Sequence, residues 1–154
     1  MDIEGISLPK IHLLVYFTGF LGLNSIISLN TINFAVRMAT KQEVELFLNQ
    51  LKDKIKVFEV AFRPRGKNLD DLAELDITPI KRLEYLMNLK AEDYYGGPKK
   101  DTYDPTKPDY YEFGIQIKGK EVYIKISPGL PNKMVDCMSF HIAEFPMDYP
   151  LKTK

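Results

Sequence analysis

The chain has 154 residues, a length that suits one domain with a core of its own. Its 21 Lys and Arg residues balance 21 Asp and Glu residues, so the overall charge excludes a strongly basic nucleic-acid-binding domain. The single cysteine excludes an internal disulfide framework and predicts a reducing, cytoplasmic compartment. With two histidines beside it, a zinc site of the Cys/His type is not expected, and we predict neither metal nor cofactor.

The run 11–36 contains no Asp, Glu, Lys or Arg and is long enough to span a bilayer. Asparagine, serine and threonine dilute its second half. The acidic residues Asp2 and Glu4 make a poor start for a secretory signal. If the run is a true anchor, the protein is membrane-associated instead of simply cytoplasmic.

A charged, periodic sequence begins after Arg37. Three interpretations of the preceding segment stay open. It is a leader translated from an upstream start with Met38 as the working initiator, a membrane anchor or uncleaved signal, or an extra helix packed on the domain. We divide the chain into an apolar extension, 1–37, and a domain, 38–154, and expect the domain to fold without the extension.

The first predicted helix covers about 41–54. Thr40-Lys41-Gln42-Glu43 is a capping box, with Thr at the N-cap and Glu three residues later. Apolar residues then recur at helical spacing: Val44, Phe47, Leu48, Leu51 and Ile55. The β-rich stretch "VFEVAFR", 57–63, predicts a strand.

Two shorter helices follow the predicted strand. The stretch "LDDLAEL", 69–75, predicts the first. Thr78-Pro79 starts the second, with Thr as N-cap and Pro at the first helical position. We expect its buried stripe to consist of four apolar residues: Ile80, Leu83, Leu86 and Met87.

The stretch 96–109, "GGPKKDTYDPTKPD", predicts a mobile loop, since it holds two Gly and three Pro without apolar periodicity. Three strands follow, at about 110–117, 121–127 and 134–142. Short connections make them an antiparallel meander. The predicted class is therefore α+β, with helices packed on one face of a small, mainly antiparallel sheet.

Side chains of a strand alternate between two faces. The apolar alternates of the first two meander strands define a core face: Tyr111, Phe113, Ile115, Ile117, Val122, Ile124 and Ile126. In the third strand we expect Met134, Met138, Phe140 and Ile142 on that face, opposed by Val135, Cys137, Ser139 and His141.

A two-residue turn at Lys118-Gly119 sets the first hairpin's register. Glu112 then lies opposite Lys125, and Gly114 lies opposite Tyr123, leaving a gap where a planar group could bind. The register of the last hairpin stays open.

A tight turn in that hairpin puts Cys137 opposite Tyr123 and His141 more than about 10 Å from Lys125. A looser loop puts His141 opposite Tyr123.

The polar face so formed holds six residues of interest: Glu112, Gln116, Tyr123, Lys125, Ser139 and His141. It is either an ordinary solvated face or a site for RNA cleavage. A 2′-hydroxyl can cleave its own phosphodiester without metal, given a base, cations for the phosphoryl oxygens and an acid for the leaving oxygen. Glu and His can serve as base and acid, Lys can hold phosphate, and Tyr can stack on a nucleobase or donate a hydrogen bond.

Over about 41–142 the chain resembles the RelE-like mRNA interferase toxins of bacterial type II toxin–antitoxin pairs, and among them the MqsR type. The resemblance depends on four strings, on the strand after the first of them, and on their order along the chain. The strings are "QEVELFLNQL", "LMNLKAEDYYGGP", "EVYIKI" and "CMSFH". The most telling pieces are "VYIKI" and "SFH". This sequence has Gly96 where those toxins have a lysine, and it closes the last strand with histidine where they have lysine.

The resemblance implies a metal-independent endoribonuclease, held inactive by a cognate antitoxin, that inhibits translation by cutting RNA. It implies a catalytic or RNA-contacting role for Tyr123, a supporting role for Lys125, and family positions near Glu112 and at His141. We expect catalysis from Tyr123, His141 and Glu112, and RNA binding by Lys125, Ser139 and Gln116. The partners implied are RNA and the antitoxin, with DNA contacted only through the antitoxin complex. The alternative is a non-catalytic regulatory or protein-binding α+β module.

Overall fold

The computed structural model describes residues 38–64 and 66–153, so the extension 1–37 and its three interpretations lie outside the described residues. Helix α1, Lys41–Phe58, begins at the predicted capping box. The Thr40 side chain accepts from the Glu43 N–H, and the Glu43 carboxylate accepts from the Thr40 N–H. All five predicted apolar positions of α1 are buried. The helix continues to Phe58, so the strand predicted at 57–63 shortens to β1, Val60–Phe62.

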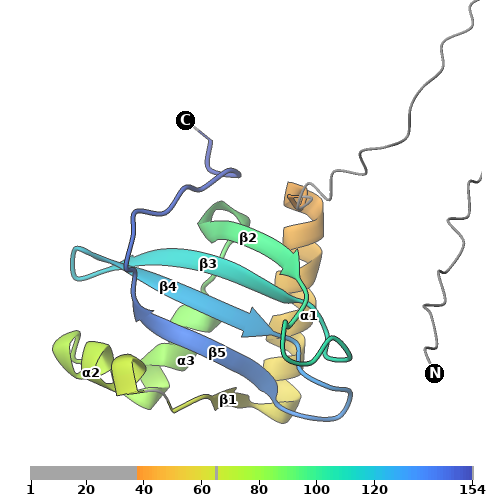
Figure 1. Ribbon diagram of the computed structural model, residues 1–154, viewed down its shortest axis with the longest axis horizontal. Coiled ribbons are helices and arrows are strands. Elements are labelled where there is room, and N and C mark those ends of the chain that lie inside the picture. Colours follow the sequence, from red (N-terminus) through yellow and green to blue (C-terminus); the bar gives the residue numbers. More distant parts are fainter. Residues whose placement is uncertain (1–37, 65, 154) are drawn as a thin grey trace, which may run out of the picture. The chain divides into compact units, whose positions relative to one another are not determined.

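The described residues form a five-stranded sheet in the order β1-β5-β4-β3-β2 (Figure 1). The other strands are β2, Tyr94–Lys99; β3, Tyr110–Ile117; β4, Lys120–Ser127; and β5, Val135–Ile142. Strand β1 pairs parallel with β5, and all other pairs are antiparallel. The predicted meander, β3-β4-β5, is confirmed, and so is the α+β class.

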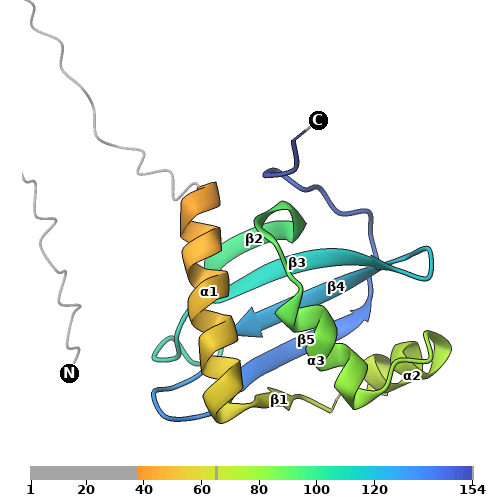
Figure 2. The same cartoon turned by 180° about the vertical axis from the view of Figure 1, so that it is seen from behind.

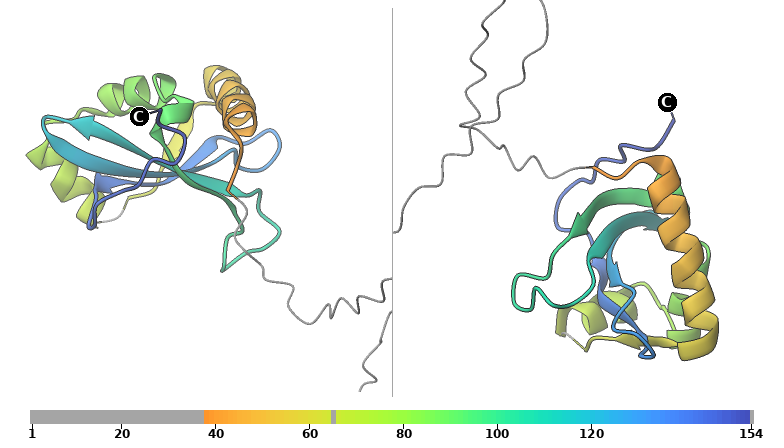
Figure 3. Two further views of the ribbon diagram at one scale, coloured as in Figure 1. Left: turned by 90° about the horizontal axis from the view of Figure 1, so that it is seen from above. Right: turned by 90° about the vertical axis from the view of Figure 1, so that its right-hand side faces the viewer.

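Helices α1 and α3, Pro79–Met87, cover the same face of the sheet (Figures 2 and 3). The opposite side, turned toward the viewer in Figure 1, is called the open face below. Helix α2, Gly66–Glu74, lies beside β5, where the Asp71 carboxylate accepts a 2.7 Å hydrogen bond from the Ile142 N–H. A 3-10 turn, Ala91–Asp93, leads into β2. In the described part of the chain, no helix is long and apolar enough to cross a membrane.

The predicted buried stripe of α3 is wrong in two of its four positions. Ile80 is 73% exposed and Leu83 is 37% exposed, whereas Leu86 is fully buried. The helix turns Tyr85 toward the core, against Phe140, with the ring centroids 6.4 Å apart. Aromatic burial decides the rotation of this short helix, because a tyrosine ring covers more apolar surface than either exposed aliphatic side chain.

The predicted loop 96–109 is wrong over its first four residues, which belong to β2. Gly96 pairs with Glu112 and Lys99 pairs with Tyr110. Pro98 removes one donor from the ladder, and an edge strand such as β2 tolerates that loss. Pairing with β3 therefore makes a strand of a sequence in which apolar and polar residues do not alternate. Our prediction of a mobile loop now applies to 100–109 alone.

A β-bulge in β5 reverses the expected side-chain alternation in the part of the strand that precedes it. Lys125 pairs with Ser139, but the next residue along β4, Ile126, pairs with Cys137, so Met138 is the extra residue. The expected alternation is therefore correct for 139–142 and wrong before the bulge. Cys137 and Val135 belong to the hydrophobic core, on the same side as Phe140.

We predict that the Cys137 thiol of the folded protein reacts with a disulfide reagent about 10³-fold more slowly than the unfolded chain at pH 8. The thiol is 1% exposed, and burial raises its pKa from 9.0 to about 12, so the thiolate fraction falls about 10³-fold. Labelling with Ellman's reagent, with and without denaturant, measures the ratio. Rapid labelling of the folded protein would contradict a core position and would mean that the Cys137 side chain lies on the open face.

Candidate functional site

Strand pairing arranges the predicted site residues in rows across the open face. The β3–β4 register is the predicted one: Glu112 lies opposite Lys125, and Gly114 lies opposite Tyr123. The connecting turn uses Lys118 at φ 50° and Gly119 at φ 79°. Positive φ at both central residues is the geometry that suits a tight antiparallel hairpin.

Tyr123 and His141 are direct cross-strand neighbours. Their ring centroids lie 5.3 Å apart with the planes tilted by 41°. Of the two registers that the sequence leaves open, the looser loop is therefore correct. His141 Nδ1 lies 2.8 Å from the Ile142 carbonyl oxygen. A carbonyl only accepts, so Nδ1 carries a proton and Nε2 is the nitrogen free for proton exchange.

Glu112 lies opposite Lys125, within hydrogen-bonding distance of Tyr123, and is 6% exposed. Its Oε1 accepts a 2.8 Å hydrogen bond from the Tyr123 hydroxyl. Its Oε2 accepts from Lys99 Nζ, in an ion pair that ties β2 to β3. Glu112 is almost inaccessible from solvent, so its chemistry reaches a substrate through Tyr123.

Burial and the Glu112 carboxylate act on the ionisation of Tyr123. Burial raises the pKa of the phenol far above 10.0, and the hydrogen bond to Glu112 raises it further. The phenol is therefore neutral at any physiological pH. Burial is the largest single influence on the pKa of Lys99 and lowers it, but the hydrogen bond to Glu112 and the charge of that carboxylate together raise the pKa above its ordinary value, so the ammonium stays charged.

The three residues predicted to bind RNA lie at different depths. Lys125 Nζ lies 3.7 Å from the centroid of the Tyr110 ring, a cation–π contact. Ser139, opposite Lys125, is buried, whereas Gln116 is exposed at the hairpin end, opposite Glu121. All three share the open face, and the Lys125–Ser139 pair lies two residues along the strands from the Tyr123–His141 pair.

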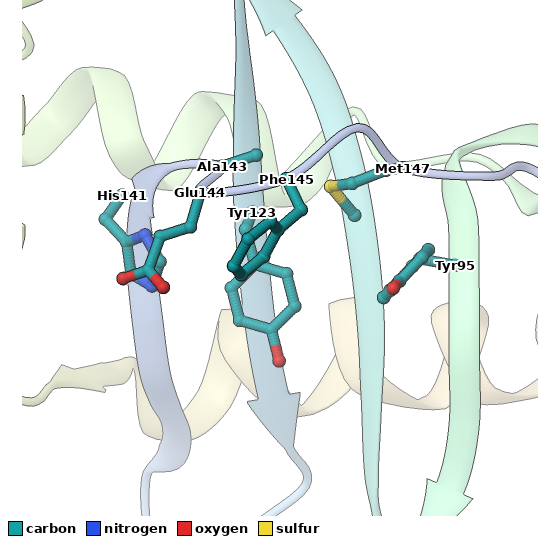
Figure 4. Close-up of a pocket in the computed structure, with 7 residues that line it drawn as sticks. All are labelled: Tyr95, Tyr123, His141, Ala143, Glu144, Phe145 and Met147. Carbon is teal, nitrogen blue, oxygen red and sulfur yellow. The ribbon is translucent and has the colours of Figure 1, made fainter.

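Residues 143–153, called the strap below, follow β5 and cross the open face near the ends of β4 and β3 (Figures 1 and 4). Glu121 anchors the strap, accepting a 3.1 Å bond from the Met147 N–H and a 2.6 Å bond from the Tyr149 hydroxyl. A Cβ on Gly114 would lie 2.8 Å from Met147 Cε and in contact with the Tyr149 hydroxyl. The gap expected beside Gly114 is therefore filled by the strap, and the prediction of an open slot there is wrong.

A pocket of about 250 Å³ opens between the Tyr123–His141 pair, the strap and β2 (Figure 4). Its lining consists of Tyr95, Tyr123, His141, Ala143, Glu144, Phe145 and Met147. Tyr95 approaches Tyr123 edge-to-face, with ring centroids 6.4 Å apart. The strap thus turns a flat sheet face into an aromatic pocket beside the candidate catalytic groups.

The sequence reasoning missed five of the seven lining residues, and Lys99 beside Glu112 as well. The five are Tyr95, Ala143, Glu144, Phe145 and Met147. Lys99 lies in the stretch predicted to be a loop, and Tyr95 lies next to that stretch. The strap carries two prolines and no periodic pattern, so nothing in its sequence assigns it to the site. Across 38–64 and 66–153, no group of three His, Cys, Asp or Glu could hold a metal ion.

A second hollow, of about 390 Å³, lies at the other end of β4 and β5. Apolar side chains of Leu130, Met134 and Met138 line it, together with the ion pair of Arg63 and Asp136. Leu130 and Met134 are exposed to solvent. Lys107 and Lys133 also line it, so the hollow combines apolar and charged side chains.

Comparison with known proteins adds no relative: no family model matches the chain, and neither a curated protein nor a solved structure is significantly similar to it.

Proposed function

We propose that this protein is a metal-independent endoribonuclease, an mRNA interferase that acts as the toxin of a type II toxin–antitoxin pair. The observation that carries the proposal is the contact between Tyr123 and His141, backed by the hydrogen bond from Tyr123 to buried Glu112. A proton acceptor and a proton donor thus lie side by side at the mouth of one pocket. RNA cleavage by the adjacent 2′-hydroxyl needs that pair of functions.

The proposed step forms the bond from the 2′-oxygen to phosphorus and breaks the bond from phosphorus to the 5′-oxygen. The Tyr123 oxygen accepts the 2′-hydroxyl proton while its own proton passes to Glu112. In its doubly protonated form, His141 gives the proton on Nε2 to the leaving 5′-oxygen and keeps the proton on Nδ1. The products are a 2′,3′-cyclic phosphate and a 5′-hydroxyl.

Lysine side chains supply the positive charge that this step needs on the phosphoryl oxygens. Lys99 lies against Glu112, and Lys125 lies two residues from Tyr123, or about 7 Å along β4. A side chain at Gly96 would start 2.8 Å from Glu112 Oε2 and displace the carboxylate. Lys99 therefore brings an ammonium group to the region where the resemblance leads one to expect a lysine at 96.

The test is RNA cleavage by the purified full chain in EDTA, with the product ends identified. We expect 2′,3′-cyclic phosphate and 5′-hydroxyl ends, and growth arrest when the chain is expressed without an antitoxin. If the chain cleaves neither free RNA nor mRNA in a translating extract, the ribonuclease function is wrong. Cleavage that needs added Mg²⁺ contradicts the mechanism.

A non-catalytic protein-binding role is the second candidate, and the apolar hollow at Leu130, Met134 and Met138 favours it. The same hollow would also suit the antitoxin of an active toxin. The EDTA assay separates the two roles, because a binding module leaves RNA intact under every condition.

A further inference from the structure

We infer that the pocket beside Tyr123 and His141 is a nucleobase subsite, in which one base of single-stranded RNA stacks between Tyr95 and Phe145. The inference deepens the proposed function and rests on it. It assigns a role to the strap and to β2, neither of which enters the proton transfers. The ligand is the base of a nucleotide next to the cleaved bond.

The lining of the pocket favours a base over a phosphate. Four of its seven residues carry rings: Tyr95, Tyr123, His141 and Phe145. Among the described residues that line it there is no lysine or arginine to hold a phosphate. Aromatic faces hold any of the four bases by stacking, a recurrent mode of single-strand recognition.

Phe145 is the strongest single indication of a ligand. Its side chain is 76% exposed, and within the described part of the chain it makes no contact with another ring. In Figure 4 it points from the strap back over the Tyr123 ring. The hydrogen bonds from Met147 and Tyr149 to Glu121 hold the strap in place on the C-terminal side of Phe145. A phenylalanine ring that is exposed to solvent, on a strap fixed by hydrogen bonds, is available to stack on a planar ligand.

The size of the pocket sets how much of a nucleotide it takes. Its volume of about 250 Å³ is below the roughly 300–1,000 Å³ of pockets for drug-sized ligands. It therefore suits one base, with the sugar and phosphate left outside. The phosphate then lies over the open face toward Lys99 and Lys125, and the sugar lies at Tyr123 and His141.

The experiment uses the full chain and a short RNA with 2-aminopurine at one position. A 2′-deoxy sugar at the cleaved nucleotide blocks attack, so the catalytic residues stay unaltered. Moving 2-aminopurine along the RNA should reveal one position where binding quenches its fluorescence. Phe145→Ala and Tyr95→Leu should each abolish that quenching and weaken binding about 5- to 150-fold, the range for losing one stacked base.

Two controls make the result specific. Ile80→Ala removes an apolar side chain of similar exposure, 73%, on the opposite side of the sheet, and should change nothing. An RNA that lacks the base at the quenched position should bind the parent and Phe145→Ala equally. Phe145→Ala is expected to fold normally, so its result stands even if Tyr95→Leu unfolds.

The outcomes separate the subsite from the proposed function. If all-ribose RNA is cleaved but Phe145→Ala binds and quenches like the parent, the subsite is wrong and the ribonuclease stands. If quenching depends on Phe145 but RNA is never cleaved, the ribonuclease is wrong and the subsite stands. If the RNA does not bind at all, the subsite is wrong, and cleavage of mRNA in the translating extract decides the ribonuclease function separately.

Discussion

Replacing His141 by alanine is expected to slow RNA cleavage by about 10²- to 10⁴-fold, the usual contribution of one acid–base group. The domain should stay folded, because the side chain lies on the open face, outside the hydrophobic core. Single-turnover cleavage rates and thermal unfolding of the parent and the variant measure the two effects. A variant that is folded and cleaves like the parent contradicts the role of His141.

A chemical substitution in the RNA tests whether His141 is specifically the acid. When sulfur replaces the 5′-oxygen at the cleaved bond, a thiolate leaves without needing a proton. The His141→Ala variant should then cleave almost as fast as the parent. A defect of unchanged size on this substrate means that His141 positions RNA or acts as the base instead.

Two further variants serve as comparisons for His141. Tyr123→Phe removes the hydroxyl that links the substrate to Glu112, so its defect should persist on the sulfur-containing RNA. Lys125→Ala should weaken binding and lower the salt dependence by about 0.7 in the logarithmic slope, the value for one phosphate contact on a single strand. A defect of the same kind in all three variants would contradict the separate roles.

Replacing Phe140 by alanine is expected to lower the free energy of unfolding by about 3–5 kcal/mol. Phe140 is 2% exposed, faces Ile124 across the strand pair and packs against Tyr85 of α3. Its loss leaves a cavity where the sheet meets the helix layer. Urea unfolding followed by circular dichroism measures the change, together with a fall in Tm of roughly 10–20 °C.

The matched control for Phe140 is Phe145, five positions along the chain. Phe145→Ala removes the same ring from an exposed site and should change the free energy of unfolding by less than about 0.5 kcal/mol. If Phe140→Ala does not fold, Phe140→Leu provides a smaller defect that can be measured. Equal, small effects at both positions would place Phe140 outside the core.

Local patterns in the sequence predict the start of α1 and the first hairpin correctly. The N-cap of α1 depends on Thr40 and Glu43 alone, three residues apart, so no distant contact is needed to recognise it. The β3–β4 register follows from a two-residue turn and from alternation on both sides of it. The same alternation predicts that six polar residues share one face of the sheet.

Packing between distant segments determines features that side-chain alternation along a strand cannot predict. The bulge at Met138 depends on how β5 fits between β1 and β4. The sequence of β5 alone therefore does not show that Cys137 and His141 lie on opposite faces of the sheet. Strand β2 forms because it pairs with the edge of β3, and this pairing explains why a stretch rich in Gly and Pro is a strand although its sequence predicts a loop.

Local sequence patterns likewise predict only some of the residues that meet at the candidate site. The sequence by itself determines that Glu112, Tyr123 and His141 share a face, because strand periodicity is a local property. The tertiary structure alone decides that His141 lies opposite Tyr123, that Lys99 pairs with Glu112, and that the strap completes the pocket. These contacts join segments 13 or more residues apart, and their free energy depends on burial and pairing that exist only in the folded domain.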